Sequence, residues 1–157
     1  MEPGFRKASG RDLEILVGFV AEYYALDGHT FEEGRVRAAL ETLIRDESLG
    51  RLWVIGDGRG PWAMPVGYAV LTLGFSLEYG GRDAFVDEVF IQEPYRGRGW
   101  GRRAMEFAEE EARNLGVRAL HLEVTRANAR ARSLYESLGY QEHDRPLLTK
   151  VLKGSSQ

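Results

Sequence analysis

Arginine and glycine alternate in the stretch from Arg96 to Arg103, which follows a β-branched and apolar run and precedes a helical pattern. Glycines at positions 97, 99 and 101 let the backbone approach a ligand closely, and the amides of a first helical turn point outward at the positive end of the helix dipole. These residue types predict a site for an anion such as a phosphate. The alternative is that the glycines only allow a tight turn between a strand and a helix.

Two common nucleotide-binding motifs do not fit this stretch. A Walker loop ends in Lys-Ser/Thr, which is absent, and the dinucleotide fingerprint needs Gly-x-Gly-x-x-Gly within a parallel βαβ unit. Here the spacing is Gly-x-Gly-x-Gly, and the preceding strands read as antiparallel hairpins. The pattern Arg-x-x-Gly-x-Gly, from Arg96 to Gly101, resembles the pyrophosphate-binding motif of the GNAT superfamily of N-acetyltransferases.

A second segment, residues 128–140, strengthens this resemblance. It reads Asn-x-x-Ala-x-x-Leu-Tyr-x-x-Leu-Gly-Tyr. It is similar to the family segment Asn-x-x-Ala-x-x-Leu-Tyr-x-x-Leu-Gly-Phe/Tyr and lies at the expected distance after the glycine-rich stretch. The order of the predicted elements also agrees with the family fold, so the resemblance covers the chain from Gly4 to Leu152.

The resemblance implies that acetyl-CoA is the co-substrate and lies between the strand that ends at Ile91 and the strand that ends near Thr125. The residues implied to contact it are Val89, Phe90, Ile91, Arg96, Gly97, Arg98, Gly99, Trp100, Gly101, Arg102, Asn128 and Arg130. Backbone groups of Val89, Phe90 and Ile91 would bind the pantetheine, and amides of the glycine-rich stretch would bind the pyrophosphate. Asn128 would contact the pantetheine arm. Arg130 or Arg132 would reach a phosphate, with solvated surface arginines as the alternative.

The family reaction is direct attack of a neutral amine on the thioester in a ternary complex. An alkyl amine is neutral in only about one molecule per thousand at neutral pH, so a proton acceptor helps, and the departing thiolate needs a proton donor. Tyr135 matches the tyrosine acid of the family, and its other reading is an aromatic on the apolar face of a helix.

The candidate bases are Glu88 and, second, Asp87, which are neighbours on one strand. Regular alternation would send their side chains to opposite faces, so only one could face the substrate. The alternative is that both are structural or only attract the substrate by charge.

Acceptor contacts are expected from the early helix-loop-helix and from the end of the third strand. The candidates are Tyr24, His29, Glu78 and Tyr79. Tyr24 could equally belong to the core, and a lone histidine is more often a surface residue. Because His121 lacks the spacing of a ligand cluster, no metal is predicted.

The elements that must position these residues follow from hydrophobic periodicity and turn signals. Strands are expected over residues 4–8, 51–55, 66–77, 84–91, 117–125, 140–143 and 147–152. Helices are expected after Ser9, after the capping-box spacing Thr30 to Glu33, from Trp100 onward, and over residues 131–138. The order β-α-α-β-β-β-α-β-α-β-β predicts an α/β, GNAT-like fold with a mixed, mostly antiparallel central sheet of six to seven strands and about four flanking helices.

The 157 residues have the length of one domain. We expect residues 1–152 to form a single N-acetyltransferase domain and residues 153–157 to form a flexible tail. No apolar run approaches the ~20 residues needed to cross a membrane, there is no signal-peptide pattern, and there is no cysteine, so we expect a cytoplasmic protein without membrane association. The net charge of −3 argues against a nucleic-acid partner. A homodimer is the default for such small enzymes.

Two functions from different classes are compatible with these motifs. The first is an acetyl-CoA-dependent N-acetyltransferase whose acceptor is a primary amine, either of a small molecule such as a polyamine or amino-acid-like amine, or of a peptide or protein. The alternative is a non-catalytic acyl-CoA-binding regulatory module, against which Tyr135 and Asn128 argue. A third hypothesis is a nucleic-acid-binding protein that uses the arginines. Its affinity for nucleic acid would fall steeply with rising salt concentration and would not depend on CoA.

Overall fold

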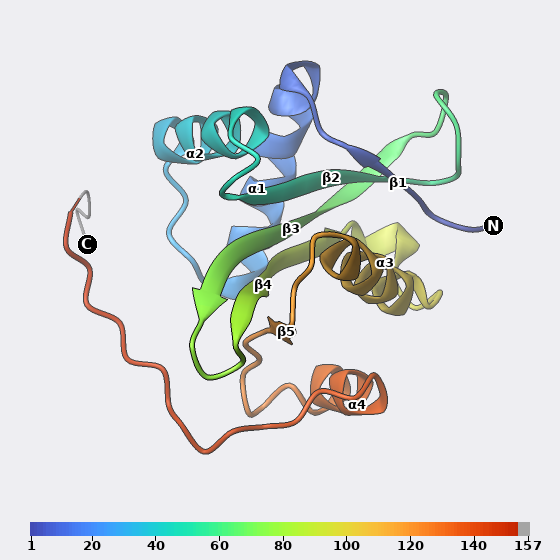
Figure 1. Cartoon of the computed structure of the whole chain (residues 1–157). Helices are drawn as coiled ribbons and strands as arrows, with labels where there is room; N and C mark the ends of the chain where they lie inside the picture. Colours follow the sequence, from blue (N-terminus) through green and yellow to red (C-terminus); the bar gives the residue numbers. More distant parts are fainter. Residues whose placement is uncertain (154–157) are drawn as a thin grey trace. The chain divides into compact units, whose positions relative to one another are not determined.

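Residues 1–153 are described by a computed structural model of the protein, in which five strands form one sheet, accompanied by four α-helices and two short 3-10 helices (Figure 1). The strands are β1 (Gly4–Lys7), β2 (Gly50–Gly56), β3 (Pro65–Ser76), β4 (Gly81–Ile91) and β5 (Ala119–His121). The helices are η1 (Gly10–Asp12), α1 (Leu13–Asp27), α2 (Glu33–Arg45), η2 (Glu93–Tyr95), α3 (Trp100–Asn114) and α4 (Ala129–Ser137).

The chain divides into two compact units, Met1–Glu123 and Val124–Gln157. The first unit holds all five strands with α1, α2 and α3, and the second holds α4. A single domain over residues 1–152 therefore stays a prediction. Apart from Lys153, the predicted flexible tail lies outside the described residues.

The sheet has the order β1-β2-β3-β4-β5. The first four strands pair antiparallel, and β5 pairs parallel to β4. Short turns connect β2 to β3 and β3 to β4, which is why these strands run antiparallel. The chain reaches β5 only after crossing the sheet through α3, as a parallel connection requires. The prediction of a mixed, mostly antiparallel sheet is confirmed.

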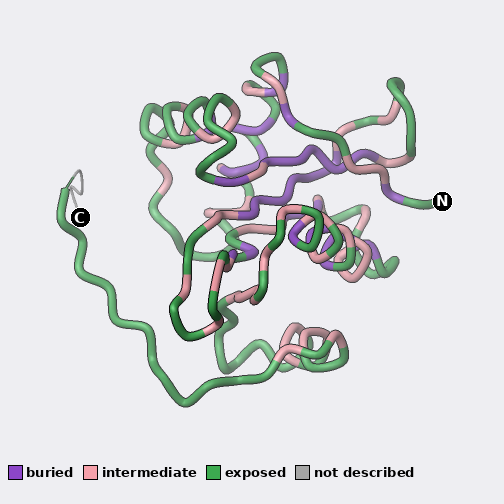
Figure 2. Tube along the Cα trace, viewed as in Figure 1, coloured by how far each residue is buried: buried purple, intermediate pink, exposed green. Residues whose placement is uncertain are grey.

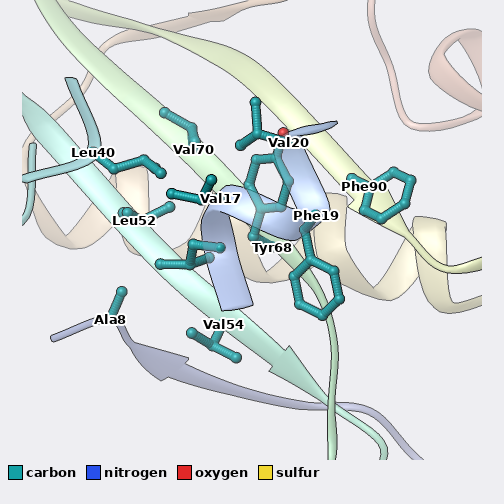
Figure 3. Close-up of a cluster of buried hydrophobic side chains, with 11 residues drawn as sticks. Ala8, Val17, Phe19, Val20, Leu40, Leu52, Val54, Tyr68, Val70 and Phe90 are labelled. Atoms are coloured by element: carbon teal, nitrogen blue, oxygen red, sulfur yellow. The ribbon is translucent and has the colours of Figure 1, made fainter. Parts of the chain in front are cut away.

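Helices α1 and α2 cover one face of the sheet, which we call the α1 face (Figure 1). Its core is a cluster of apolar side chains from α1, α2 and the three central strands, with the fully buried Tyr68 among them (Figure 3). Figure 2 shows that burial concentrates in the central strands and on the inner side of α1. Burial of apolar surface at roughly 25 cal/mol per Å² is therefore the main force that fixes α1 on the sheet.

Helix α3 covers the opposite face, which we call the α3 face. The Phe107 ring stacks on Phe5 at 4.5 Å between centroids and meets Trp53 edge-on at 5.1 Å. Trp100, Ala104 and further small residues of α3 are buried. The start of α3 is thereby fixed against the sheet, beside the end of β4.

Two helix boundaries show how local sequence directs the fold. Ser9 N donates to Asp12 Oδ2 at 2.8 Å ahead of α1, and α1 ends at Gly28, whose φ of 73° suits glycine. The start of α2 differs from the expectation at Thr30, because Glu32 caps this helix and accepts from the amides of Gly34 and Arg35.

The described residues contain five strands where six to seven were expected. The predicted strand over residues 117–125 is reduced to three residues, and residues 140–143 and 147–152 form no strand. Residues 140–152 are exposed over most of their length, and Pro146 between the two predicted strands has no amide proton to donate. An extended segment gains ladder hydrogen bonds only beside another strand, so these residues stay irregular.

Candidate functional site

Strands β4 and β5 separate soon after they meet. Their pairing covers only residues 83–85 of β4, with the amide of Arg118 donating to Arg82 O just before it. From Val86 to Ile91, β4 has β3 on one side and, among residues 1–153, no strand on the other. The family resemblance implies a cofactor at this separation.

A β-bulge interrupts β4 at its midpoint. Val70 faces Glu88 and the next residue, Leu71, faces Val86, so Asp87 is an extra residue in β4. Residues directly opposite across two strands share a face. Val86 therefore lies on the α3 face with Leu71, whereas Glu88 lies on the α1 face with Val70. The regular alternation assumed for Asp87 and Glu88 is broken, and the bulge turns Glu88 toward α1.

The bulge also determines where the backbone groups of β4 point. Gln92 N donates to Val66 O, so the backbone of residue 92 faces β3. Alternation along an antiparallel ladder then turns the N–H and C=O groups of Ile91 and Val89 to the opposite side, where β4 has no neighbour among the described strands. Ile91 O accepts from Arg96 Nε at 2.6 Å. Val89 thus presents backbone hydrogen-bonding groups one residue after Glu88.

Two tyrosines hydrogen-bond the carboxylate of Glu88. Tyr24 Oη donates to Glu88 Oε2 and Tyr68 Oη donates to Glu88 Oε1, each at 2.7 Å. Burial raises the pKa of Glu88, the two hydroxyls lower it, and the charge of Asp87 raises it again; the net direction is upward. Burial and the Glu88 charge in turn raise the pKa of both tyrosines, so they remain protonated donors.

His29 and Asp87 border this cluster. The His29 ring meets Tyr24 edge-on at 5.3 Å, and His29 Nε2 lies 2.7 Å from Asp27 Oδ2. Asp87 is exposed at the sheet surface, yet desolvation by the surrounding protein raises its pKa. Its charge also contributes to the raised pKa of Tyr24, so the carboxylates of Asp87 and Glu88 both act on the Tyr24 hydroxyl.

The glycine-rich stretch forms the turn between β4 and α3. Gly97 and Gly99 have φ of 75° and 80°, a region that favours glycine. Gly99 caps α3 without any side-chain hydrogen bond, and the first turn contains no acidic residue. Arg103 N donates to Gly99 O as the first helical bond, so the amides ahead of it have no helical acceptor. This is the arrangement by which a helix start binds an anion.

The arginine side chains of this stretch make contacts within the loop and with the end of β4. Arg96 bonds Ile91 O and lies over the Phe90 ring, so its side chain anchors the loop to the strand end. Arg98 bonds Pro94 O at 3.1 Å and lies over the Tyr95 and Trp100 rings. The Trp100 side chain is buried. The side chains of Arg96, Arg98 and Trp100 are thus engaged within the protein, whereas the amides at the start of α3 have no helical acceptor.

The second unit holds the remaining motif residues. Asn128 Oδ1 accepts from Ala131 N at 3.1 Å and caps α4, while Arg130 is exposed. Burial raises the pKa of Tyr135, whose ring contacts Tyr140. Arg132 pairs with Glu142 at 2.7 Å. The capping role of Asn128 accounts for its place at the start of this segment.

The structure brings Tyr24 and His29 to Glu88 but leaves Glu78 and Tyr79 elsewhere. The latter two lie in the β3–β4 turn, where the Tyr79 ring is 5.6 Å from His121. The distance along β4 from its start to Glu88 is roughly 20 Å, at a rise of about 3.3 Å per residue. Sequence reasoning missed Tyr68; a tyrosine in an otherwise apolar strand was the available signal, because a buried hydroxyl needs a partner.

Within residues 1–153, no group of three histidine or acidic side chains could hold a metal ion. None of the described helices is both long enough and apolar enough to cross a membrane.

Comparison with known proteins gives consistent matches. The model of the acetyltransferase (GNAT) family matches residues 16–140. The uncharacterized N-acetyltransferase YycN of Bacillus subtilis is 40% identical over 67 residues, which are 43% of this chain and 43% of that protein. The thialysine N-epsilon-acetyltransferase of Bos taurus is 32% identical over 87 residues, 55% of this chain and 49% of that protein. These matches span half or less of each relative.

A solved structure matches over nearly the whole length. The integron cassette protein from the mobile metagenome of Cole Harbour Salt Marsh is 35% identical, with a TM-score of 0.81. The match covers 96% of this chain and 91% of that protein.

Proposed function

This chain belongs to the GNAT family of acetyltransferases, and from that premise we propose that it transfers the acetyl group of acetyl-CoA to a primary amine. The observation that carries the proposal is the β4 bulge. It places the carboxylate of Glu88 on the α1 face, next to Val89, whose backbone groups lack a strand partner in the described chain. A proton acceptor and a strand able to hydrogen-bond the pantetheine are therefore adjacent in the chain.

The residues present fit acetyl-CoA at the end of β4. Val89 would hydrogen-bond the pantetheine through its backbone, and the amides of residues 97–102 would bind the pyrophosphate. Ile91 contributes less than expected, because Arg96 already uses its carbonyl oxygen. The absence of an acidic side chain in the first turn of α3 supports this role, since a carboxylate there would repel a phosphate. Bound there, acetyl-CoA supplies the activated acetyl thioester.

The proposed reaction is a direct transfer within a ternary complex. The acceptor amine loses a proton to Glu88, directly or through a water, and attacks the carbonyl carbon. A C–N bond forms, the C–S bond breaks, the CoA thiolate takes a proton, and the nitrogen, which attack leaves positively charged, releases a second proton to solvent as the amide forms. From the family resemblance we assign that donation to Tyr135, whose raised pKa keeps it protonated. Asp87 is the second candidate base.

A cationic acceptor fits the charges around Glu88 best. Asp87 and Asp27 lie in the same region, and Asp87 already acts electrostatically on Glu88. A protonated amine would be attracted by these carboxylates and would be neutralised as Glu88 accepts its proton. The name of the bovine relative, which specifies a thialysine ε-amine, supports an acceptor with a flexible alkyl-amine arm. We therefore place polyamines and lysine-like amines first in any substrate panel.

The test combines cofactor binding with turnover. Isothermal titration should detect acetyl-CoA binding, and release of the CoA thiol should follow addition of an amine from a panel of polyamines, lysine analogues and peptides. Glu88→Gln should lower kcat by about 10²–10⁴-fold with little change in acetyl-CoA affinity. Glu109→Gln, on the outer surface of α3, is the matched control and should keep both values.

Two outcomes would contradict the proposal. If acetyl-CoA does not bind, the cofactor site is wrong. If it binds but no amine in the panel releases the thiol, the non-catalytic acyl-CoA-binding module becomes the better description.

A further inference from the structure

Glu88 receives one hydroxyl donor on each carboxylate oxygen, from two elements that are distant in the sequence. Tyr24 comes from α1 and Tyr68 from β3, and both O···O distances are 2.7 Å. Two donors on different oxygens fix the carboxylate plane, which one donor would leave free to rotate. Each oxygen retains a further lone pair, so the carboxylate can still accept a proton.

Packing alone does not explain the two hydroxyls. Tyr68 is fully buried within the core of the α1 face, 6.1 Å between ring centroids from Phe90 (Figure 3). A phenylalanine would fill that space with almost the same contacts and would need no polar partner. A buried hydroxyl is retained at low cost only when it is hydrogen-bonded, and here its partner is Glu88.

The environment of Glu88 would otherwise favour its neutral form. Burial disfavours the charge, and the neighbouring Asp87 repels it. The hydroxyls of Tyr24 and Tyr68 act in the opposite direction, and His29, whose ring meets the Tyr24 ring edge-on, assists electrostatically. A base must be ionised before it can accept a proton, so these donors determine whether Glu88 is ready to act.

We propose that Tyr24 and Tyr68 are positioning residues that together hold the carboxylate of Glu88 ionised and in one orientation on the α1 face. This inference rests on the proposed role of Glu88 as the base. Neither tyrosine transfers a proton to the substrate; each acts through Glu88. Because α1, β3 and β4 each contribute one member, the base is assembled only when these three elements have packed together.

The direct test is an NMR titration of the Glu88 carboxyl carbon in protein labelled with ¹³C-glutamate, with the resonance assigned by its loss in Glu88→Gln. Removing one hydroxyl donor in Tyr24→Phe or Tyr68→Phe should raise the pKa of Glu88 by about one unit, and the double variant should raise it further. Tyr95→Phe removes a hydroxyl from η2, outside this cluster, and should leave the titration unchanged. A Glu88 pKa unmoved in both single variants would overturn the proposal.

Activity gives the second readout. The acid limb of the kcat/KM–pH profile should move to higher pH by the same amount as the NMR titration, while acetyl-CoA affinity stays as in the wild type. Loss of activity at every pH without a shifted limb would indicate a structural role only, against the proposal. Should Tyr68→Phe fail to fold, Tyr24→Phe at the edge of the core still decides the question. Should the wild type transfer no acetyl group, the proposed function fails, yet the titration still tests the positioning role.

Discussion

A carboxylate at position 88 lies among aromatic side chains on the α1 face of the sheet. Water is partly excluded there, and removing a charge from water is unfavourable unless it is hydrogen-bonded. Tyr24 and Tyr68 supply two such bonds, but they only partly offset burial and the repulsion by Asp87, because the net pKa of Glu88 remains raised. The ionised form of Glu88 therefore lowers the stability of the fold, which is consistent with its proposed role as a proton acceptor.

The raised pKa of Glu88 predicts how the free energy of unfolding depends on pH. The pKa of Glu88 is higher in the folded than in the unfolded state, so its neutral form stabilises the fold at pH below the unfolded value of about 4.3. That contribution is lost as the pH rises through the folded pKa. The wild type should therefore lose stability relative to Glu88→Gln as the pH rises from about 4 through the folded pKa. Urea unfolding at several pH values measures the difference; a difference that is constant or grows with pH would refute the assignment.

At the scale of elements, the junction of β4 and α3 combines an outward-facing strand edge with a helix start that lacks a side-chain cap. Gly101 lies in the first turn of α3, and a Cβ atom built there meets nothing within 4 Å. A side chain at this position would therefore extend into space that a bound pyrophosphate would use. The free protein gives no packing reason for glycine at position 101, which supports a ligand-related reason.

Gly101→Ala should accordingly separate stability from binding. Alanine in a helix should increase stability by about 0.5–1 kcal/mol, whereas the added methyl group should weaken acetyl-CoA binding by tenfold or more, about 1.4 kcal/mol. Gly18→Ala is the matched control, because Gly18 lies within α1 and also has nothing within 4 Å of its Cβ position. Thermal melting and isothermal titration of both variants give the two quantities. Unchanged acetyl-CoA affinity in Gly101→Ala would argue against amide binding at this turn.

The sequence predicts most of these elements because their signals are local. Glycines stop α1 at Gly28, and the apolar spacing from Trp100 to Ala112 identifies the buried side of α3. The Asp87 bulge is not local, since it exists only as a mismatch of register between β3 and β4. The faces of Glu88 and Val89 follow from that mismatch and were therefore beyond prediction.

The distinction between local and non-local signals also explains where else the structure differs from the sequence-based predictions. The separation of Glu78 from Tyr24 depends on the length of the β3–β4 hairpin, which a motif search does not measure. Residues 140–152 carry strand-like composition, yet a strand also requires a neighbour in register. Tyr68 lies in the core, and its hydroxyl bonds Glu88 only because the bulge turns Glu88 toward it.

At the scale of the whole molecule, the motif residues belong to both units. The strand edge, the glycine-rich turn and Glu88 lie in Met1–Glu123, whereas Asn128 and Tyr135 lie in Val124–Gln157. The family model runs through both, from residue 16 to residue 140. Contacts of Asn128 and Tyr135 with acetyl-CoA, and a single domain over residues 1–152, therefore remain predictions from the family resemblance.

A ligand that binds only the folded state stabilises it by mass action. At 100 times its Kd, acetyl-CoA should add about 2.7 kcal/mol, which for a chain of this size corresponds to a rise in Tm of roughly 5–10 °C. Hydrogen exchange measured by mass spectrometry should then show protection over residues 97–103 and also over residues 128–135, because the family resemblance implies cofactor contacts in each of these segments. CoA alone should protect the same segments, and adenosine at the same concentration should protect neither. Protection confined to the first unit would mean that Asn128 and Tyr135 do not take part in cofactor binding and that the assignment of Tyr135 as the acid needs another basis.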